Sequence, residues 1–129
     1  MTVKVEEMTK ERIIYISIIA PLSFPVDVET PLSSTVAFKQ AAGVPVCCIM
    51  DFTQSNLGFS DMIMGLALSQ GKPGGFWDPD VYSIIVGTLD WVKFGIKAMQ
   101  EQEQYKGARA EAIVGSREEA LELAHSLLK

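Results

Sequence analysis

The sequence predicts a single α/β domain built on a mixed, mostly parallel sheet of about five strands. With 129 residues the chain can bury one modest core and is short for two domains, so we expect one domain over residues 1–129. Short apolar segments recur along the chain, and after the second of them a segment with helical character separates each from the next. The resulting order, ββαβαβαβα, requires parallel strands joined by right-handed crossovers.

The first two strands are expected to form an antiparallel hairpin. Residues 2–8 and 12–20 are largely apolar, and the polar tripeptide Thr9-Lys10-Glu11 between them suits a tight connection. The second strand is the more apolar of the two and should be the more buried. Residues 21–33 contain three prolines together with small and acidic residues, and are therefore predicted to be an irregular connection.

A helix and a central strand are predicted next. The helix should begin at Ser33 or Ser34 and end at Ala42, because Gly43 suits the position that follows a helix C-terminus. Residues 44–52 form a nearly unbroken apolar run, as expected for a strand covered on both faces.

Two adjacent cysteines, Cys47 and Cys48, fall within this strand. Successive side chains of a strand point to opposite faces, so a disulfide between the two is not expected. We predict two reduced, buried thiols that act as small hydrophobic residues, which fits a cytoplasmic protein.

A helix is predicted from Ser60 to about Gln70, with the Ser60 hydroxyl as its cap. Residues 71–75, Gly-Lys-Pro-Gly-Gly, should end it as a turn, since they lack the spacing of a phosphate-binding loop and follow a helix instead of a strand. The remaining predicted elements before the last helix are a loop over 76–80, a strand over 81–86, a helix from Gly87-Thr88 to about Gln100 and a strand over 108–114.

The closing helix has the clearest local signal. Ser116 and Glu119 match a capping box, in which the serine caps the helix and the glutamate reaches back to it. The predicted apolar face consists of Ala120, Leu123, Ala124, Leu127 and Leu128. His125 is predicted on the polar face, where a cation near the C-terminus suits the helix dipole, and no catalytic role is expected for it.

Composition excludes several function classes. Sixteen acidic and eleven basic residues give a net charge of −5, which argues against a nucleic-acid partner. One His and two Cys leave few ingredients for a metal site or a Ser-His-Asp triad, and no cofactor is expected. The most apolar stretch, residues 13–24, is interrupted by polar residues and is shorter than the roughly 20 residues of a membrane span. No secretory signal is expected either.

Three loops should follow the carboxyl ends of parallel strands: 51–60, 87–90 and 115–118. In open parallel sheets such loops line the binding crevice. The last two echo each other as Ile-Val-Gly-Thr and Ile-Val-Gly-Ser, and two helix N-termini there could hold an anion. Acidic residues in both loops oppose this, and the repeat is also the ordinary way for a strand to lead into a helix.

The carboxylates Asp51, Asp78 and Asp80 are the remaining candidates for acid–base chemistry. Paired catalytic carboxylates need contrasting environments, and the sequence shows none here. We therefore expect these three side chains to be solvated in their loops.

Four aromatic residues are candidates for an interface. Phe76 and Trp77 lie in a predicted loop, and Trp91 and Phe94 lie near the start of a predicted helix. Trp91 and Val92 are adjacent, so one narrow helix face cannot bury both completely. These aromatics either belong to the core or form a contact with a second copy or a partner, and a homodimer is expected.

The segment Asp51-Phe-Thr-Gln-Ser-Asn-Leu-Gly-Phe-Ser-Asp-Met62, placed in this element order, resembles the STAS domain family, whose best-known members are the bacterial SpoIIAA-like anti-sigma-factor antagonists. In that family an Asp ends the strand and a phosphorylatable serine begins the helix that follows. Counting from Asp51 places Ser60 at this serine, while Phe59, Asp61 and Met62 replace the usual flanking residues. The ending Ala-Ile-Val-Gly-Ser-Arg-Glu-Glu-Ala also looks like that of uncharacterised bacterial STAS-like proteins.

The resemblance implies a non-catalytic regulatory module that binds a partner protein, with phosphorylation at Ser60 modulating the binding. The residues it implicates are Asp51, Thr53, Ser55, Ser60 and Asp61. Two alternatives stay open. One is a carrier of a small apolar or lipid-like ligand, with a cavity among Met62, Met64, Trp91 and Met99. The other is an enzyme of unknown chemistry, for which Asp51 is the best candidate residue.

Overall fold

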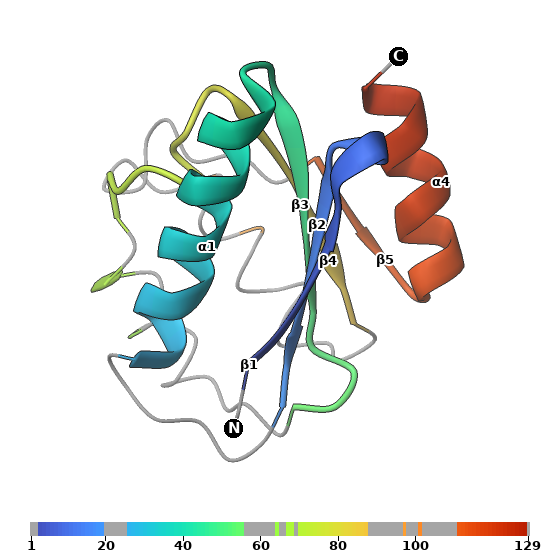
Figure 1. The fold of residues 1–129 in the computed structure, drawn as a ribbon. Coiled ribbons are helices and arrows are strands. Elements are labelled where there is room, and N and C mark those ends of the chain that lie inside the picture. The colour runs from blue at the N-terminus through green and yellow to red at the C-terminus, as the bar shows by residue number, and fades with distance from the viewer. Residues whose placement is uncertain are drawn as a thin grey trace.

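The fold is an α/β arrangement, seen in a computed structural model that describes residues 3–19, 26–55, 64, 67–68, 70–87, 97, 101 and 111–128 (Figure 1). It contains a five-stranded mixed sheet, so the predicted fold class is confirmed at this level. The elements, in chain order, are β1 (Val3–Met8), a 3-10 turn η1 (Thr9–Glu11), β2 (Ile13–Ile18), α1 (Val26–Ala42), β3 (Val46–Asp51), β4 (Val81–Val86), β5 (Ala112–Val114) and α4 (Arg117–Leu127).

The strands lie in the sheet in the order in which they occur in the chain. β1 and β2 form the predicted antiparallel hairpin, whose turn closes with Arg12 in the left-handed conformation at φ 60°. β2, β3, β4 and β5 are parallel. Binding crevices of open sheets form where the strand order reverses, and this order does not reverse.

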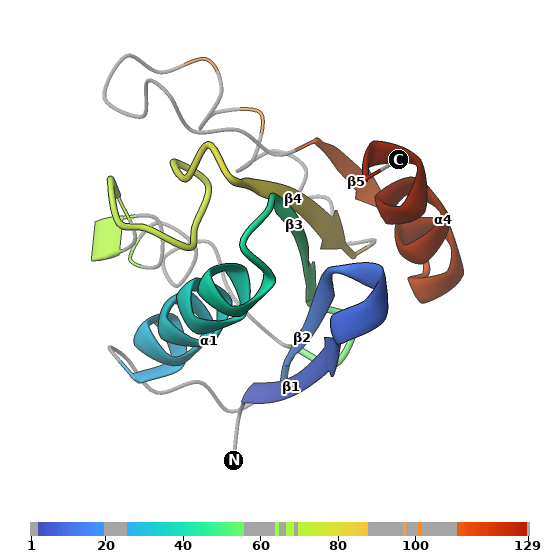
Figure 2. The ribbon, with the colours of Figure 1, turned by 45° about the horizontal axis from the view of Figure 1, so that its top comes forward.

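Of the helices that the structure describes, α1 covers one face of the sheet and α4 covers the other (Figure 2). Because strand side chains alternate between the faces, β3 contributes to two separate apolar clusters. Cys48 packs in the cluster beneath α1 with Ile14, Ile16 and Phe38. Cys47 packs in the cluster beneath α4. Both thiols are free and buried, as predicted.

Helix α1 starts at Val26, so the predictions of a start at Ser33 or Ser34 and of an irregular segment over 21–33 were wrong for residues 26–33. Pro31 lies inside the helix. A proline near a helix start costs about one backbone hydrogen bond, and here its side chain is buried on the same stripe as Thr35 and Phe38. The packing of that stripe on the sheet outweighs the lost bond.

The end of α1 is as predicted. Gly43 has φ 69°, and its N–H donates to the carbonyl of Lys39 at 3.1 Å. This bond is typical of an α-helix whose C-terminus is followed by one residue in the left-handed conformation. β3 follows α1 after three residues and occupies the centre of the sheet.

The closing helix is also confirmed. The Ser116 hydroxyl accepts a hydrogen bond from the N–H of Glu119 at 3.3 Å, and Ala120 and Ala124 are buried against the sheet. β4 matches the predicted strand, whereas β5 starts at Ala112 and residues 108–110 lie outside the described part of the chain. The helices predicted over 60–70 and 87–100 also lie largely outside it.

Candidate functional site

The carboxyl end of β3 is organised by Asp51. Its side chain is only 8% exposed, and it accepts a hydrogen bond from the Tyr15 hydroxyl on Oδ2. Its Oδ1 accepts from the N–H of Thr53 at 2.8 Å and from the Thr53 hydroxyl at 2.6 Å. The expectation that Asp51 is solvated in its loop was wrong, because neighbouring groups replace water at both oxygens.

These bonds give the loop after β3 a defined start. An Asp that binds the N–H two residues ahead forms an Asx turn. Immediately beyond, the N–H of Ser55 donates to the carbonyl of Phe52 at 3.0 Å, which closes a second turn. Thr53 and Gln54 are exposed at its tip, and Ser55 is half-buried. Residues 51–55 are therefore shaped by local bonds.

Tyr15 connects Asp51 to the start of α4. The tyrosine is 2% exposed and lies on β2 beside β3. The guanidinium of Arg117 lies over its ring, 4.3 Å from the centroid, in a cation–π arrangement. Arg117 also donates to the Glu6 carboxylate of β1 at 2.7 Å. These contacts form a polar chain, Glu6–Arg117–Tyr15–Asp51–Thr53. It links β1, β2 and β3 to the first residue of α4.

The charges in this polar chain are mutually stabilised. Burial and the hydrogen bond to Asp51 raise the pKa of Tyr15, so its hydroxyl stays protonated and donates. The hydrogen bond between Arg117 and Glu6 lowers the pKa of Glu6 and raises that of Arg117. A phenol with a raised pKa is a poor proton donor to a substrate. The arrangement is suited to holding a loop and a helix start in place.

The predicted site residues separate into three groups. Asp51 and Thr53 are in direct contact, and Ser55 follows them in the same loop. Ser60, Asp61, Trp91 and Phe94 lie outside the described residues. Phe76 and Trp77 lie in the predicted loop before β4 and are half-buried.

Tyr15, Arg117 and Glu6 were not singled out from the sequence. Tyr15 is the one residue with a polar tip inside the apolar run Ile13–Ile16, which is a weak signal because tyrosines are common in strands. Arg117 and Glu6 look like ordinary surface charges, and only the return of α4 over the sheet brings them together.

A second buried carboxylate, Asp78, lies in the loop before β4. Its Oδ2 accepts from the Lys39 ammonium at 2.6 Å and from the N–H of Gly74 at 2.8 Å, and its Oδ1 accepts from the N–H of Asp80 at 2.9 Å. Burial alone would raise the pKa of Asp78, but these hydrogen bonds together outweigh it and hold the pKa below its usual value. The prediction of solvation was wrong for Asp78, while Asp80 is exposed as predicted.

The Gly-Lys-Pro-Gly-Gly turn lies against α1 because of Gly74. A Cβ at this position would lie 2.6 Å from the carbonyl oxygen of Leu32, and the residue has φ 85°. Both facts require glycine. The Asp78 bonds and the Gly74 contact together attach the loop before β4 to α1.

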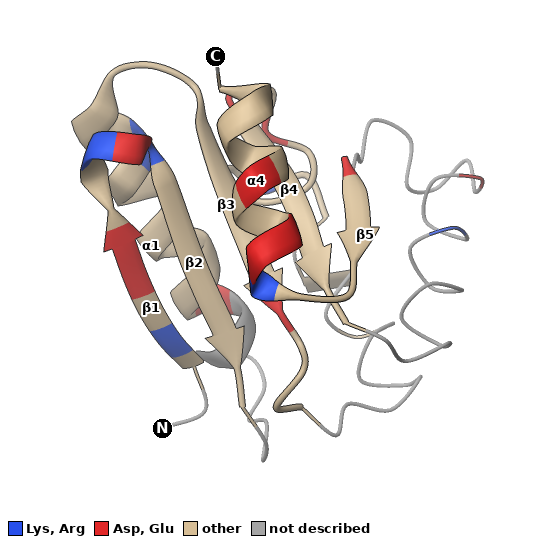
Figure 3. Ribbon diagram, turned by 90° about the vertical axis from the view of Figure 1, so that its right-hand side faces the viewer, with Lys and Arg blue, Asp and Glu red and all other residues tan. Residues whose placement is uncertain are grey.

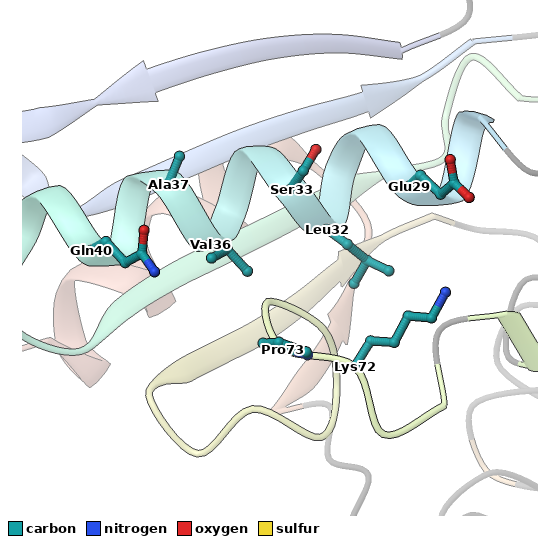
Figure 4. Close-up of a pocket in the computed structure, with 8 residues that line it drawn as sticks. All are labelled: Glu29, Leu32, Ser33, Val36, Ala37, Gln40, Lys72 and Pro73. Carbon is teal, nitrogen blue, oxygen red and sulfur yellow. The ribbon is translucent and has the colours of Figure 1, made fainter.

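An open groove of about 470 Å³ runs between α1 and the start of this loop (Figure 4). Leu32, Val36 and Pro73 line its middle, and Glu29 and Lys72 lie near the same end. The described residues that line this groove include none of the four expected to form a carrier cavity. Met64 is exposed, and Met62, Trp91 and Met99 lie outside the described part.

The two cysteines and His125 are the remaining described groups that could carry chemistry. Burial raises the pKa of Cys48 to about 11 and also raises that of Cys47, so both thiols stay protonated. The described residues contain no group of three or more His, Cys, Asp or Glu side chains that could hold a metal ion. His125 lies on the polar face of α4, 3.2 Å from a Glu11 carboxylate oxygen. In the part of the chain that the structure describes, no helix has both the length and the apolar character to cross a membrane.

Comparison of the chain with protein-family models, with curated proteins and with solved structures gives no match.

Proposed function

We propose that this chain is a non-catalytic regulatory module of the STAS type. It binds a partner protein through the loop from Asp51 to Asp61 and the helix expected after it, and phosphorylation of Ser60 modulates the binding. The observation that carries the proposal is the use of Asp51. Both of its carboxylate oxygens bind groups of the chain itself, so Asp51 shapes the loop that follows β3.

The ordered start of this loop, residues 51–55 at the carboxyl end of β3, favours binding as its function. Ordering a loop on association costs free energy, and the turns at Thr53 and Ser55 meet part of that cost in the free protein. The exposed Thr53 and Gln54 at the tip provide polar groups for a partner. Arg117, at the same edge, is already held by Glu6 and the Tyr15 ring.

Phosphorylation would act on this edge through charge. A phosphoserine adds roughly 1.5 to 2 negative charges near neutral pH. The protein already carries a net charge of −5, and Arg117 is neutralised by Glu6. A phosphate on Ser60 would therefore weaken a fitted contact by repulsion and by desolvation. The proposal places the protein in the cytoplasm, where its free thiols stay reduced.

The test is recovery of a tagged copy from its own source, with the bound proteins and the phosphorylation sites read by mass spectrometry. We expect one protein to be retained by the wild type and by Ser60→Ala, and to be lost with Ser60→Asp. Ser126→Asp is the matched control, because it adds the same charge at an exposed position on α4. Equal retention by all four proteins, with no phosphate on Ser60, would refute the switch.

The groove beside α1 favours a second candidate, a carrier of a small apolar ligand. Its middle is apolar, with Leu32, Val36 and Pro73 as lining residues. Native mass spectrometry of the same preparation distinguishes the two functions. A bound organic mass that disappears with Val36→Asp would favour the carrier over the regulatory module.

A further inference from the structure

Among the strands that the structure describes, β1 forms one edge of the sheet and is paired with β2 alone (Figure 3). Among the backbone hydrogen bonds that join described residues outside the strand ladders, none involves residues 3–8. Its outward face of backbone groups can therefore pair with another strand. Lys4, Glu6 and Glu7 are exposed along it.

The register shows which backbone groups of β1 point outward. The N–H of Cys47 donates to the carbonyl of Arg12, so even-numbered residues of β2 direct their backbone groups toward β3 and odd-numbered ones toward β1. Ser17 and Tyr15 are paired with Lys4 and Glu6. Those two residues of β1 therefore bond to β2, and the alternate ones point outward.

The residues of β1 whose backbone N–H and C=O groups point away from β2 are Val3, Val5 and Glu7. A second copy can pair with this edge in antiparallel orientation about a two-fold axis normal to the sheet. This axis keeps every side chain on its own face of the sheet. Facing residues must therefore be both odd-numbered or both even-numbered, which places the axis beside one residue of β1 and its own copy. With the axis at Val5, Val5 lies opposite Val5 of the second copy, and Val3 lies opposite its Glu7.

Charge selects this register. With the axis at Val5, Lys4 lies opposite Glu6 of the second copy, and the symmetry repeats the pair. With the axis at Lys4 or at Glu6, that charged residue faces its own copy, so two like charges lie directly opposite each other. Opposite charges in facing positions stabilise a strand pair and like charges destabilise it. The charge order along β1 is thus self-complementary in one register.

We propose that two copies of this chain associate through β1, with Val5 at the two-fold axis, and form one sheet that continues across both copies. Charged edge strands generally prevent such pairing. Here the charges have both signs and match, so the same residues select a single partner, the second copy. This interface differs from the aromatic residues from which a homodimer was expected, and it does not depend on the regulatory function.

Charge reversal tests the register. Lys4→Glu places like charges opposite each other at both symmetric positions, so we expect the dissociation constant, measured by sedimentation velocity, to rise by about tenfold or more. Lys10→Glu makes the same change in charge on η1, outside the paired segment, and should leave the dimer unchanged. Glu6→Lys should also dissociate alone, and an equimolar mixture with Lys4→Glu should form a heterodimer.

Val5→Pro tests the edge itself. Proline removes an outward N–H of β1 and leaves the β1–β2 bonds in place, so the variant should stay folded by circular dichroism and be monomeric. Loss of the dimer in Val5→Pro and Lys4→Glu, with retention in Lys10→Glu, supports the proposal. A wild-type protein that is monomeric at high micromolar concentration overturns it. A dimer that persists in both variants also overturns it.

Discussion

Asp78→Asn tests the attachment of the loop before β4 to α1. The Asp78 side chain is 2% exposed, and its two oxygens accept three hydrogen bonds, from Lys39, Gly74 and Asp80. An amide has one oxygen, so one of the two positions becomes an NH₂ group that faces an N–H donor. Whichever way the amide is oriented, at least one backbone N–H, of the buried Gly74 or of the partly buried Asp80, is left without its acceptor.

The magnitude follows from these contacts. Leaving one buried donor unsatisfied costs about 1–3 kcal/mol. Lys39, whose side chain is 21% exposed, also loses its closest counter-charge, but water screens part of that loss. The sum is a loss of about 2–4 kcal/mol in the free energy of unfolding, which is roughly 10 °C in Tm for a domain of this size.

The assay is urea unfolding at neutral pH, followed by tryptophan fluorescence. Asp80→Asn is the matched control, since Asp80 lies 3.8 Å from the same Lys39 ammonium but is 60% exposed. Its substitution should cost less than about 0.5 kcal/mol. Equal, small losses in the two variants would refute the argument that burial of the Asp78 carboxylate makes these bonds important.

The pH dependence gives a second check. The native pKa of Asp78 lies below its usual value, so the unfolded chain takes up this proton at a higher pH than the folded one. The stabilisation by the carboxylate is complete above the unfolded pKa of about 3.9 and is lost as the pH falls through the lower native pKa. The difference between wild type and Asp78→Asn should be constant from about pH 7 to pH 5 and shrink below about pH 4. A difference that already shrinks near pH 6 would contradict this assignment.

Three further substitutions test separate parts of the structure. Tyr15→Phe removes a donor to the buried Asp51 and should cost about 1–3 kcal/mol in urea unfolding, and an unchanged midpoint would mean that Asp51 does not need this bond. Gly74→Ala should lower the unfolding free energy by more than about 2 kcal/mol, because the new Cβ would lie 2.6 Å from the Leu32 carbonyl oxygen. Gly43→Ala, with open space around it, should cost about 1 kcal/mol, and equal losses in the two variants would contradict the close approach at Gly74. Ser116→Ala should cost about 1 kcal/mol in thermal unfolding, and no loss would show that its cap is dispensable.

The sequence predicts the strands and α4 well because local rules decide them. The run around Cys47 and Cys48 is apolar at every position that a strand covered on both faces must bury. Ser116 and Glu119 satisfy each other within one helical turn, so no distant contact is needed to identify the helix start.

Long-range packing decides the features that were mispredicted. Pro31 reads as a helix breaker, and its place inside α1 depends on a sheet surface that binds the stripe it belongs to. Asp78 reads as a loop residue, and its burial depends on Lys39 from α1. The partners of Asp51 include Tyr15, which is distant in sequence and becomes a neighbour only through the parallel pairing of β2 and β3.

The two adjacent thiols of β3 provide separate reporters of how the structure opens. Cys48 is enclosed by the layer that α1 covers, and Cys47 by the layer that α4 covers. A thiol reagent added to the native protein can therefore reach each sulfur only when the corresponding layer exposes it. The ratio of the two labelling rates would compare how often α1 and α4 are released from the sheet, and no substitution is needed because both cysteines are native.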